Sequence, residues 1–96
     1  MVSQEKDDGW RSFIELCHGV KTKADMDTLF HLFFTPEEIS DLAGRTLIVQ
    51  ELLKGEKNQR EISREKKVSI SKITRGSNSL KQLDSGFKKW LENRLV

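Results

Sequence analysis

The sequence predicts an all-α protein, and three observations support this fold class. Apolar residues recur at separations of three, four and seven along most of the chain, which is the spacing of one helix face. Strand-like alternation of apolar and polar residues is absent, and the chain contains a single proline. A chain of 96 residues is expected to form one domain, 1–96. Because only 35% of its residues are hydrophobic, its stability would be marginal unless a partner subunit enlarged the core.

The first three helices are predicted from their apolar faces and end signals. The first, over about 7–20, places five apolar residues on one face, and the second, over about 25–33, places four. The third has the clearest start, since Thr35 can cap it, Pro36 suits its first turn and Glu38 completes a capping box. It is expected to end at Gly55.

The next two helices are predicted to form a helix-turn-helix within residues 57–81. Asn58, followed three residues later by Glu61, opens a helix over 59–66, and Ser69 can cap the helix that follows. The residues expected to pack these two helices together are Ile62, Val68 and Ile73. A sixth helix is expected from Asp84, with an apolar face along residues 87–95.

The predicted turn departs from the usual helix-turn-helix pattern at two positions. Lys67 stands where a residue tolerant of positive φ, typically glycine, is usual. A lysine in the left-handed conformation would be strained by roughly 1–2 kcal/mol. Lys66 stands where an apolar residue would be normal. Together these departures predict a turn that is longer or looser than usual.

Charge is distributed unevenly along the chain. Residues 1–53 hold 5 Lys/Arg and 10 Asp/Glu, whereas residues 54–96 hold 12 Lys/Arg and 5 Asp/Glu. A basic half on a small domain favours a polyanionic partner, most often nucleic acid, although a solvated basic surface gives the same pattern.

Catalysis and metal binding are disfavoured by the sequence. Cys17 and His18 are neighbours in a predicted helix, so their side chains diverge, and no cluster has metal-ligand spacing. His31 lies within apolar residues and is better explained by packing. The single cysteine, the polar acidic N-terminus and the absence of a long apolar run predict a cytoplasmic protein without a membrane segment. The same polar start predicts that residues 1–6 are a disordered arm.

The segment "ITRGSNSLK", residues 73–81, has helical apolar spacing but poor helix formers, which together give up roughly 3 kcal/mol of propensity relative to alanine. With "FTPEE", "GRTLIVQELLKGE" and "NQREIS", this segment closely resembles the Trp repressor family. The similarity runs without gaps from about Leu32 to Lys81, and "TRGSNSLK" is highly specific for that family.

This resemblance implies a six-helix fold assembled as an intertwined homodimer. Residues 7–56 would form the dimerisation core, 57–81 the DNA-binding element and 84–96 a C-terminal dimerisation helix. The protein would bind L-tryptophan as corepressor, without another cofactor, and then an operator DNA with two-fold symmetry. It would thereby regulate genes of tryptophan biosynthesis or uptake.

The resemblance also implies the residues of both sites. In the family the indole lies between two arginines, a small residue admits the ligand, and backbone carbonyls accept hydrogen bonds from its ammonium group. The matching ligand residues are Arg45, Arg75, Gly76, Ser79, Leu32, Phe34 and Thr35. The matching operator-facing residues are Gln59, Arg60, Ile70, Ser71, Lys72, Thr74 and Lys81, the last facing a phosphate.

Some residues depart from the family pattern, and alternatives stay open. Phe34 replaces a common leucine, and Lys72 replaces a threonine, which adds charge at the DNA face and near the ligand. Arg45 could instead form a surface ion pair, and Ile70 could belong to the core. A ligand-independent helix-turn-helix regulator, or a helical interaction module with a solubilising basic face, would show a similar sequence pattern.

Overall fold

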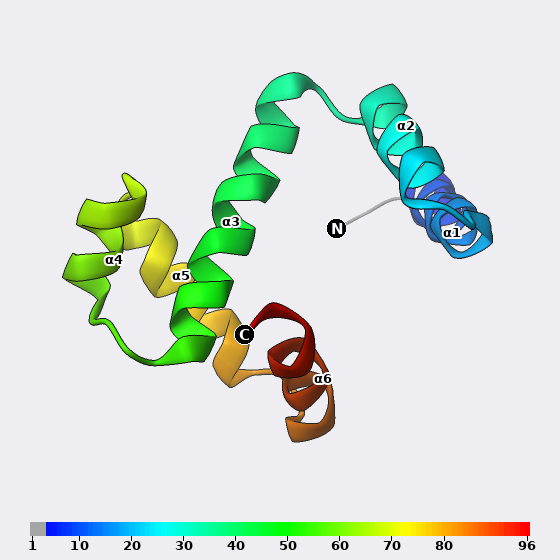
Figure 1. Cartoon of the computed structure of the whole chain (residues 1–96). Coiled ribbons are helices and arrows are strands. Elements are labelled where there is room, and N and C mark those ends of the chain that lie inside the picture. Colours follow the sequence, from blue (N-terminus) through cyan, green and yellow to red (C-terminus); the bar gives the residue numbers. More distant parts are fainter. Residues whose placement is uncertain (1–3) are drawn as a thin grey trace. The chain divides into compact units, whose positions relative to one another are not determined.

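The structure is a computed structural model that describes residues 4–96, and its regular secondary structure in this range is entirely α-helical (Figure 1). The helices are α1 (Gln4–Gly19), α2 (Lys23–Phe33), α3 (Pro36–Lys54), α4 (Gln59–Lys66), α5 (Ile70–Lys81) and α6 (Ser85–Leu95). The prediction of an all-α fold with six helices is confirmed. Helix α1 begins three residues before the expected start at residue 7, because Gln4, Glu5 and Lys6 are good helix formers. The expected disorder of residues 4–6 is therefore wrong, and residues 1–3 of the expected arm lie outside the described range.

The chain divides into two compact units, one up to Ile39 and one from Ser40 onward, and each is described by itself. The boundary falls in the first turn of α3. A single domain over 1–96 therefore stays a prediction, as do the dimerisation segments 7–56 and 84–96.

An aromatic cluster organises the unit that ends at Ile39. Phe13 of α1 makes edge-to-face contacts with Phe33 and Phe34, at ring-centroid distances of 5.4 and 5.8 Å, and Phe34 contacts Phe30 at 5.4 Å. No residue of α1 or α2 is fully buried, and Trp10 remains 63% exposed. These aromatic rings therefore hold α1 and α2 together without forming a closed core.

The helix-turn-helix and α3 share the core of the second unit. Ile62 of α4 and Ile73 of α5 are fully buried, and Ile48 of α3 completes the cluster at 2% exposure. Leu52 and Val68 pack against these residues. The predicted packing of residues 62, 68 and 73 is confirmed, and the structure adds α3 as the surface on which the motif is built.

Capping interactions fix the ends of α4 as the sequence predicts. Asn58 Oδ1 accepts from the Glu61 N–H at 2.9 Å, and Glu61 Oε1 accepts from the Asn58 N–H at 3.1 Å, which completes a capping box. At the other end Lys67 adopts the left-handed conformation, with φ 55° and ψ 45°.

The turn between α4 and α5 consists of residues 67–69, so the expectation of a longer or looser turn is wrong. The reason lies in its hydrogen bonds to Ser63. The backbone N–H groups of Lys67 and Val68 both donate to the Ser63 carbonyl, and Ser63 Oγ donates to the Val68 carbonyl at 2.6 Å. These three bonds hold the turn tight although a lysine occupies its strained position.

A buried carboxylate explains why Lys66 can replace an apolar residue. Glu51 of α3 is 5% exposed, and its oxygens lie 3.8, 3.5 and 3.5 Å from the Nζ atoms of Lys54, Lys57 and Lys66. Lys57 also forms an ion pair with Glu65. The cluster thus ties α4 to α3 at the position where other helix-turn-helix motifs use an apolar contact.

Helix α6 ends beside α3, where Gln50 Nε2 donates to the Leu95 carbonyl at 2.6 Å. Phe87 and Trp90 stack at 5.3 Å, and the Arg94 guanidinium lies 4.1 Å from the Trp90 ring centroid. Both aromatic side chains remain nearly half exposed. The apolar face of α6 is therefore only partly covered within the unit from Ser40 onward.

Candidate functional site

A pocket of about 450 Å³ lies among α3, α5 and α6. Its lining includes four residues that the resemblance assigns to ligand binding, which are Arg45, Arg75, Gly76 and Ser79. The remaining lining residues are Ile48, Val49, Lys72, Leu80, Leu83, Phe87 and Leu91. The pocket thus combines an apolar wall with cationic side chains, and its volume is within the usual range for small-molecule sites.

This lining suits a planar, negatively charged molecule. Guanidinium groups bind carboxylates with two parallel hydrogen bonds, and their flat faces stack on aromatic rings. Leu83, Phe87 and Leu91 supply apolar surface from the chain beyond residue 81. The sequence marked the apolar face of the last helix, but only the structure shows that this face reaches the pocket.

The other three expected ligand residues lie in the unit that ends at Ile39, and their role stays a prediction. Leu32 is 75% exposed, and Phe34 is half-buried in the aromatic cluster. Thr35 caps α3, because its Oγ1 accepts from the Glu38 N–H at 3.1 Å. The Thr35 carbonyl accepts from the Ile39 N–H at 3.0 Å, which leaves one lone pair for another donor.

Gly76 lines the pocket and also lies close to side chains of α3. A Cβ atom at this position would lie 3.2 Å from Ile48 Cγ2 and 3.5 Å from Leu52 Cδ1. Since Ile48 is buried in the core, a side chain at residue 76 would crowd it unless α5 or Ile48 shifted by a few tenths of an ångström. The sequence interpretation, which assigned this glycine to ligand approach alone, missed this contact.

The expected operator-facing residues gather on α4 and α5. Arg60, Ile70, Ser71, Lys72, Thr74 and Lys81 are exposed, whereas Gln59 is half-buried. Ile70 is 43% exposed, so the alternative that places it in the core is wrong. Thr74 Oγ1 donates to Gln59 Oε1 at 2.9 Å, which links the starts of the two helices.

The ion pairs divide the basic half of the chain into two groups. Lys54, Lys57 and Lys66 are bound to Glu51, and burial of that carboxylate tends to raise its pKa. The three lysines outweigh burial, so the pKa of Glu51 lies below its ordinary value. The hydrogen bond to Glu65 raises the pKa of Lys57.

The second group consists of cations that form no ion pair with any residue of the described range. It includes Arg45, Arg60, Lys72, Arg75 and Lys81. The alternative that Arg45 forms a surface ion pair is therefore wrong within residues 4–96. These side chains remain available to an anionic ligand or to phosphates.

The described residues contain neither a membrane-crossing helix nor a metal-binding cluster. Between Gln4 and Val96, no helix is both long enough and apolar enough to cross a membrane. In the same range, no group of three or more His, Cys, Asp or Glu side chains is arranged to hold a metal ion.

Comparisons with known proteins agree on one family. The family described as Trp repressor protein matches residues 8–95. A Trp operon repressor homolog from Chlamydia caviae is 45% identical over 93 residues, which cover 97% of this chain and 92% of the relative. One from Chlamydia trachomatis serovar D is 40% identical, covering 98% of this chain and all of the relative. One from Vibrio vulnificus is 44% identical over 82 residues, which cover 84% of this chain and 79% of the relative.

Proposed function

Since this chain belongs to the Trp repressor family, we propose that it is a cytoplasmic repressor that binds L-tryptophan as corepressor and then a two-fold symmetric operator DNA. It is a transcription regulator and not an enzyme. The genes that it controls would be those of tryptophan biosynthesis or uptake.

The observation that carries this proposal is the pocket shared by Arg45, Arg75, Gly76 and Ser79. In the proposed complex the indole ring lies between the two guanidinium groups, and Arg75 binds the carboxylate. Ser79 lies near the amino group. The carbonyls of residues 32, 34 and 35 accept the remaining ammonium hydrogen bonds, as the family resemblance implies.

The DNA-binding half of the proposal is supported by the exposed face of the helix-turn-helix. Short polar side chains at the start of α5 suit entry into the major groove, and Arg60, which is exposed on α4, would contact guanine. Lys81 would contact a phosphate. Filling the pocket between α3 and α5 would fix the recognition helix, and ligand and DNA would then strengthen each other's binding.

The homodimer is supported by apolar surface that the single chain leaves uncovered. Phe87 and Trp90 are 49% and 45% exposed, and in the other unit Trp10 and Phe33 are 63% and 53% exposed. Large aromatic side chains are rarely left in water in this number without a partner. In the proposed intertwined dimer they are buried against a second chain, and sedimentation equilibrium would measure the mass of that assembly.

Calorimetry with L-tryptophan tests the corepressor, because Trp10 and Trp90 would confuse a fluorescence titration. Binding heat is expected at millimolar ligand or below, and no heat would refute this half of the proposal. Duplexes selected from a random library with the protein and tryptophan would then serve as operator. A ligand-independent regulator would bind them equally well without tryptophan.

Two substitutions on α5 separate the ligand role from the DNA role. Arg75→Ala is expected to abolish the response to tryptophan. Lys81→Ala is expected to weaken DNA binding at every sequence. It should also reduce the slope of log affinity against log salt by about 1.8, because each of the two protomers of the proposed dimer loses one phosphate contact. Equal loss of ligand affinity in both variants would contradict the assignment.

A further inference from the structure

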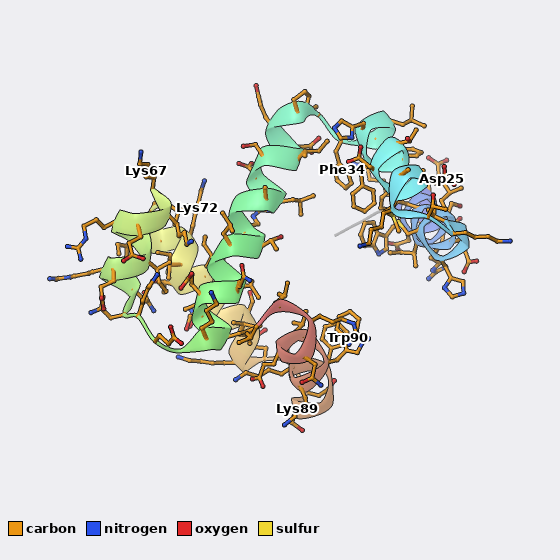
Figure 2. All side chains as sticks on the ribbon, viewed as in Figure 1. Asp25, Phe34, Lys67, Lys72, Lys89 and Trp90 are labelled. Carbon is orange, nitrogen blue, oxygen red and sulfur yellow. The ribbon has the colours of Figure 1, made fainter. Side chains whose placement is uncertain are left out.

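Lys72 lines two adjoining pockets and therefore faces the ligand site as well as solvent. It borders the 450 Å³ pocket and also a second pocket of about 200 Å³, which is lined by residues of α3, α5 and the turn. Arg45 and Ile48 are the other residues common to both. Figure 2 shows the Lys72 side chain apart from Lys67, which extends from the turn.

The position of Lys72 on α5 brings its charge close to the expected carboxylate site. It lies in the first turn of the helix and three residues before Arg75, so the two side chains share one face. The larger pocket thus has three cations in its lining, Arg45, Lys72 and Arg75, and its lining contains no Asp or Glu. The acidic residue of the second pocket is Asp41.

These three cations have no neutralising partner among residues 4–96, unlike the three lysines around Glu51. Like charges around one cavity repel each other, and a bound anion relieves that repulsion. A ligand with a carboxylate is favoured for this reason, whereas a ligand that carries only an ammonium group is disfavoured.

We propose that Lys72 is a specificity-determining residue of the ligand pocket, where its ammonium group selects indole compounds that carry a free carboxylate. This inference rests on the proposed function, since it concerns the same pocket. It gives Lys72 a role that is measurable without DNA, in addition to the operator-facing role that the resemblance implies. A threonine at this position, as the family pattern has it, would bring no charge.

The test compares two ligands that differ only in the carboxylate, L-tryptophan and L-tryptophanamide, by calorimetry without DNA. In the unmodified protein L-tryptophan is expected to bind more tightly. In Lys72→Gln the preference for L-tryptophan is expected to fall ~5-fold, which is the upper range for one exposed ion pair. The fall should come from weaker tryptophan binding, with amide binding unchanged or stronger.

Two control variants make the result specific. Lys72→Arg keeps the charge and should keep the preference. Lys89→Gln removes an exposed lysine of α6 that is not in the pocket lining, and it should also leave the preference unchanged (Figure 2).

Three outcomes would overturn the inference. If Lys72→Gln weakens the binding of both ligands by the same factor, the lysine only packs the pocket. If it weakens the binding of neither ligand, the lysine does not face the ligand. Either result leaves the proposed function intact. Absence of tryptophan binding in the unmodified protein would instead refute the corepressor itself, and this inference with it.

Discussion

Replacing Lys67 by glycine should make the protein more stable. This residue ends α4 in the left-handed conformation, with φ 55°, and it is exposed, so its side chain contributes little packing. The turn is held by backbone and side-chain bonds of Ser63, none of which uses the lysine side chain. Glycine can therefore adopt the same turn without steric strain.

The expected gain is the difference between two effects. A residue with a Cβ atom is strained by roughly 1–2 kcal/mol in this conformation. Glycine loses more backbone entropy on folding, which costs roughly 0.5–1 kcal/mol. The net gain in the free energy of unfolding is about 0.5–1 kcal/mol. For a chain of this size that gain corresponds to a rise of roughly 2–8 °C in Tm.

Thermal and urea unfolding, followed by circular dichroism at one fixed protein concentration, would measure this gain. The matched control is Lys67→Ala, which removes the charge but keeps the Cβ atom and hence the strain. Stability should increase from alanine to glycine, while alanine should differ little from lysine. Should the alanine variant equal or exceed the glycine variant in stability, the strain argument is refuted and the charge of Lys67 is responsible instead.

Three further predictions concern the unit that contains the helix-turn-helix. Because the pKa of folded Glu51 is lowered, the stability that it contributes is complete above its ordinary pKa of 4.5 and is lost as pH falls below that value. The free energy of unfolding of Glu51→Gln should therefore depend less on pH across pH 3–7, and a pH profile equal to that of the unmodified protein would contradict this role of Glu51. Ile62→Ala should lower the free energy of unfolding by about 2–5 kcal/mol in urea, whereas Ile70→Ala, at an exposed position, should change it by less than ~1 kcal/mol; similar losses would mean that the core is misplaced. Asn58→Ala should cost about 1 kcal/mol by the same assay, and Asn58→Asp, which keeps an acceptor at the cap, should restore most of it.

The helices could be predicted because their signals are local. The capping pair Asn58 and Glu61 and the cap at Ser69 lie within a few residues of the ends they specify, and the structure places those ends as expected. The motif marked Lys67 as the residue at the turn's usual glycine position, but it did not show that the lysine adopts the left-handed conformation there. Interactions of this kind involve residues that are close in sequence, so periodicity and capping signals are enough to predict where a helix begins and ends.

The contacts between helices distant in sequence could not be predicted in the same way. Nothing near Ile48 marks it as the third member of the helix-turn-helix core, and nothing near Glu51 marks it as the partner of Lys66. The close approach of Gly76 to Ile48 could likewise not be predicted from the sequence. Each depends on which face of α3 meets α4 and α5, and the periodicity of α3 does not specify that face.

The candidate site also combines features that the sequence predicts with features that only the structure shows. The residues of α5 that line the pocket were marked by a poor helix segment and by family resemblance, whereas the wall from α6 was not. The contribution of Leu32 and Thr35 to the site stays a prediction. That part of the site rests on the sequence resemblance.

The buried ion cluster of α3 and α4 also constrains how this sequence can change over evolutionary time. Replacing both Glu51 and Lys66 by well-packed apolar residues would leave no charge in the interior, and such paired replacements are commonly neutral or stabilising. Either replacement alone removes one partner, and loss of Lys66 leaves the buried carboxylate with fewer counter-ions. The two forms of the motif, ionic and apolar, are therefore separated by less stable intermediates. We therefore expect Lys66 to be difficult to replace for as long as Glu51 is kept.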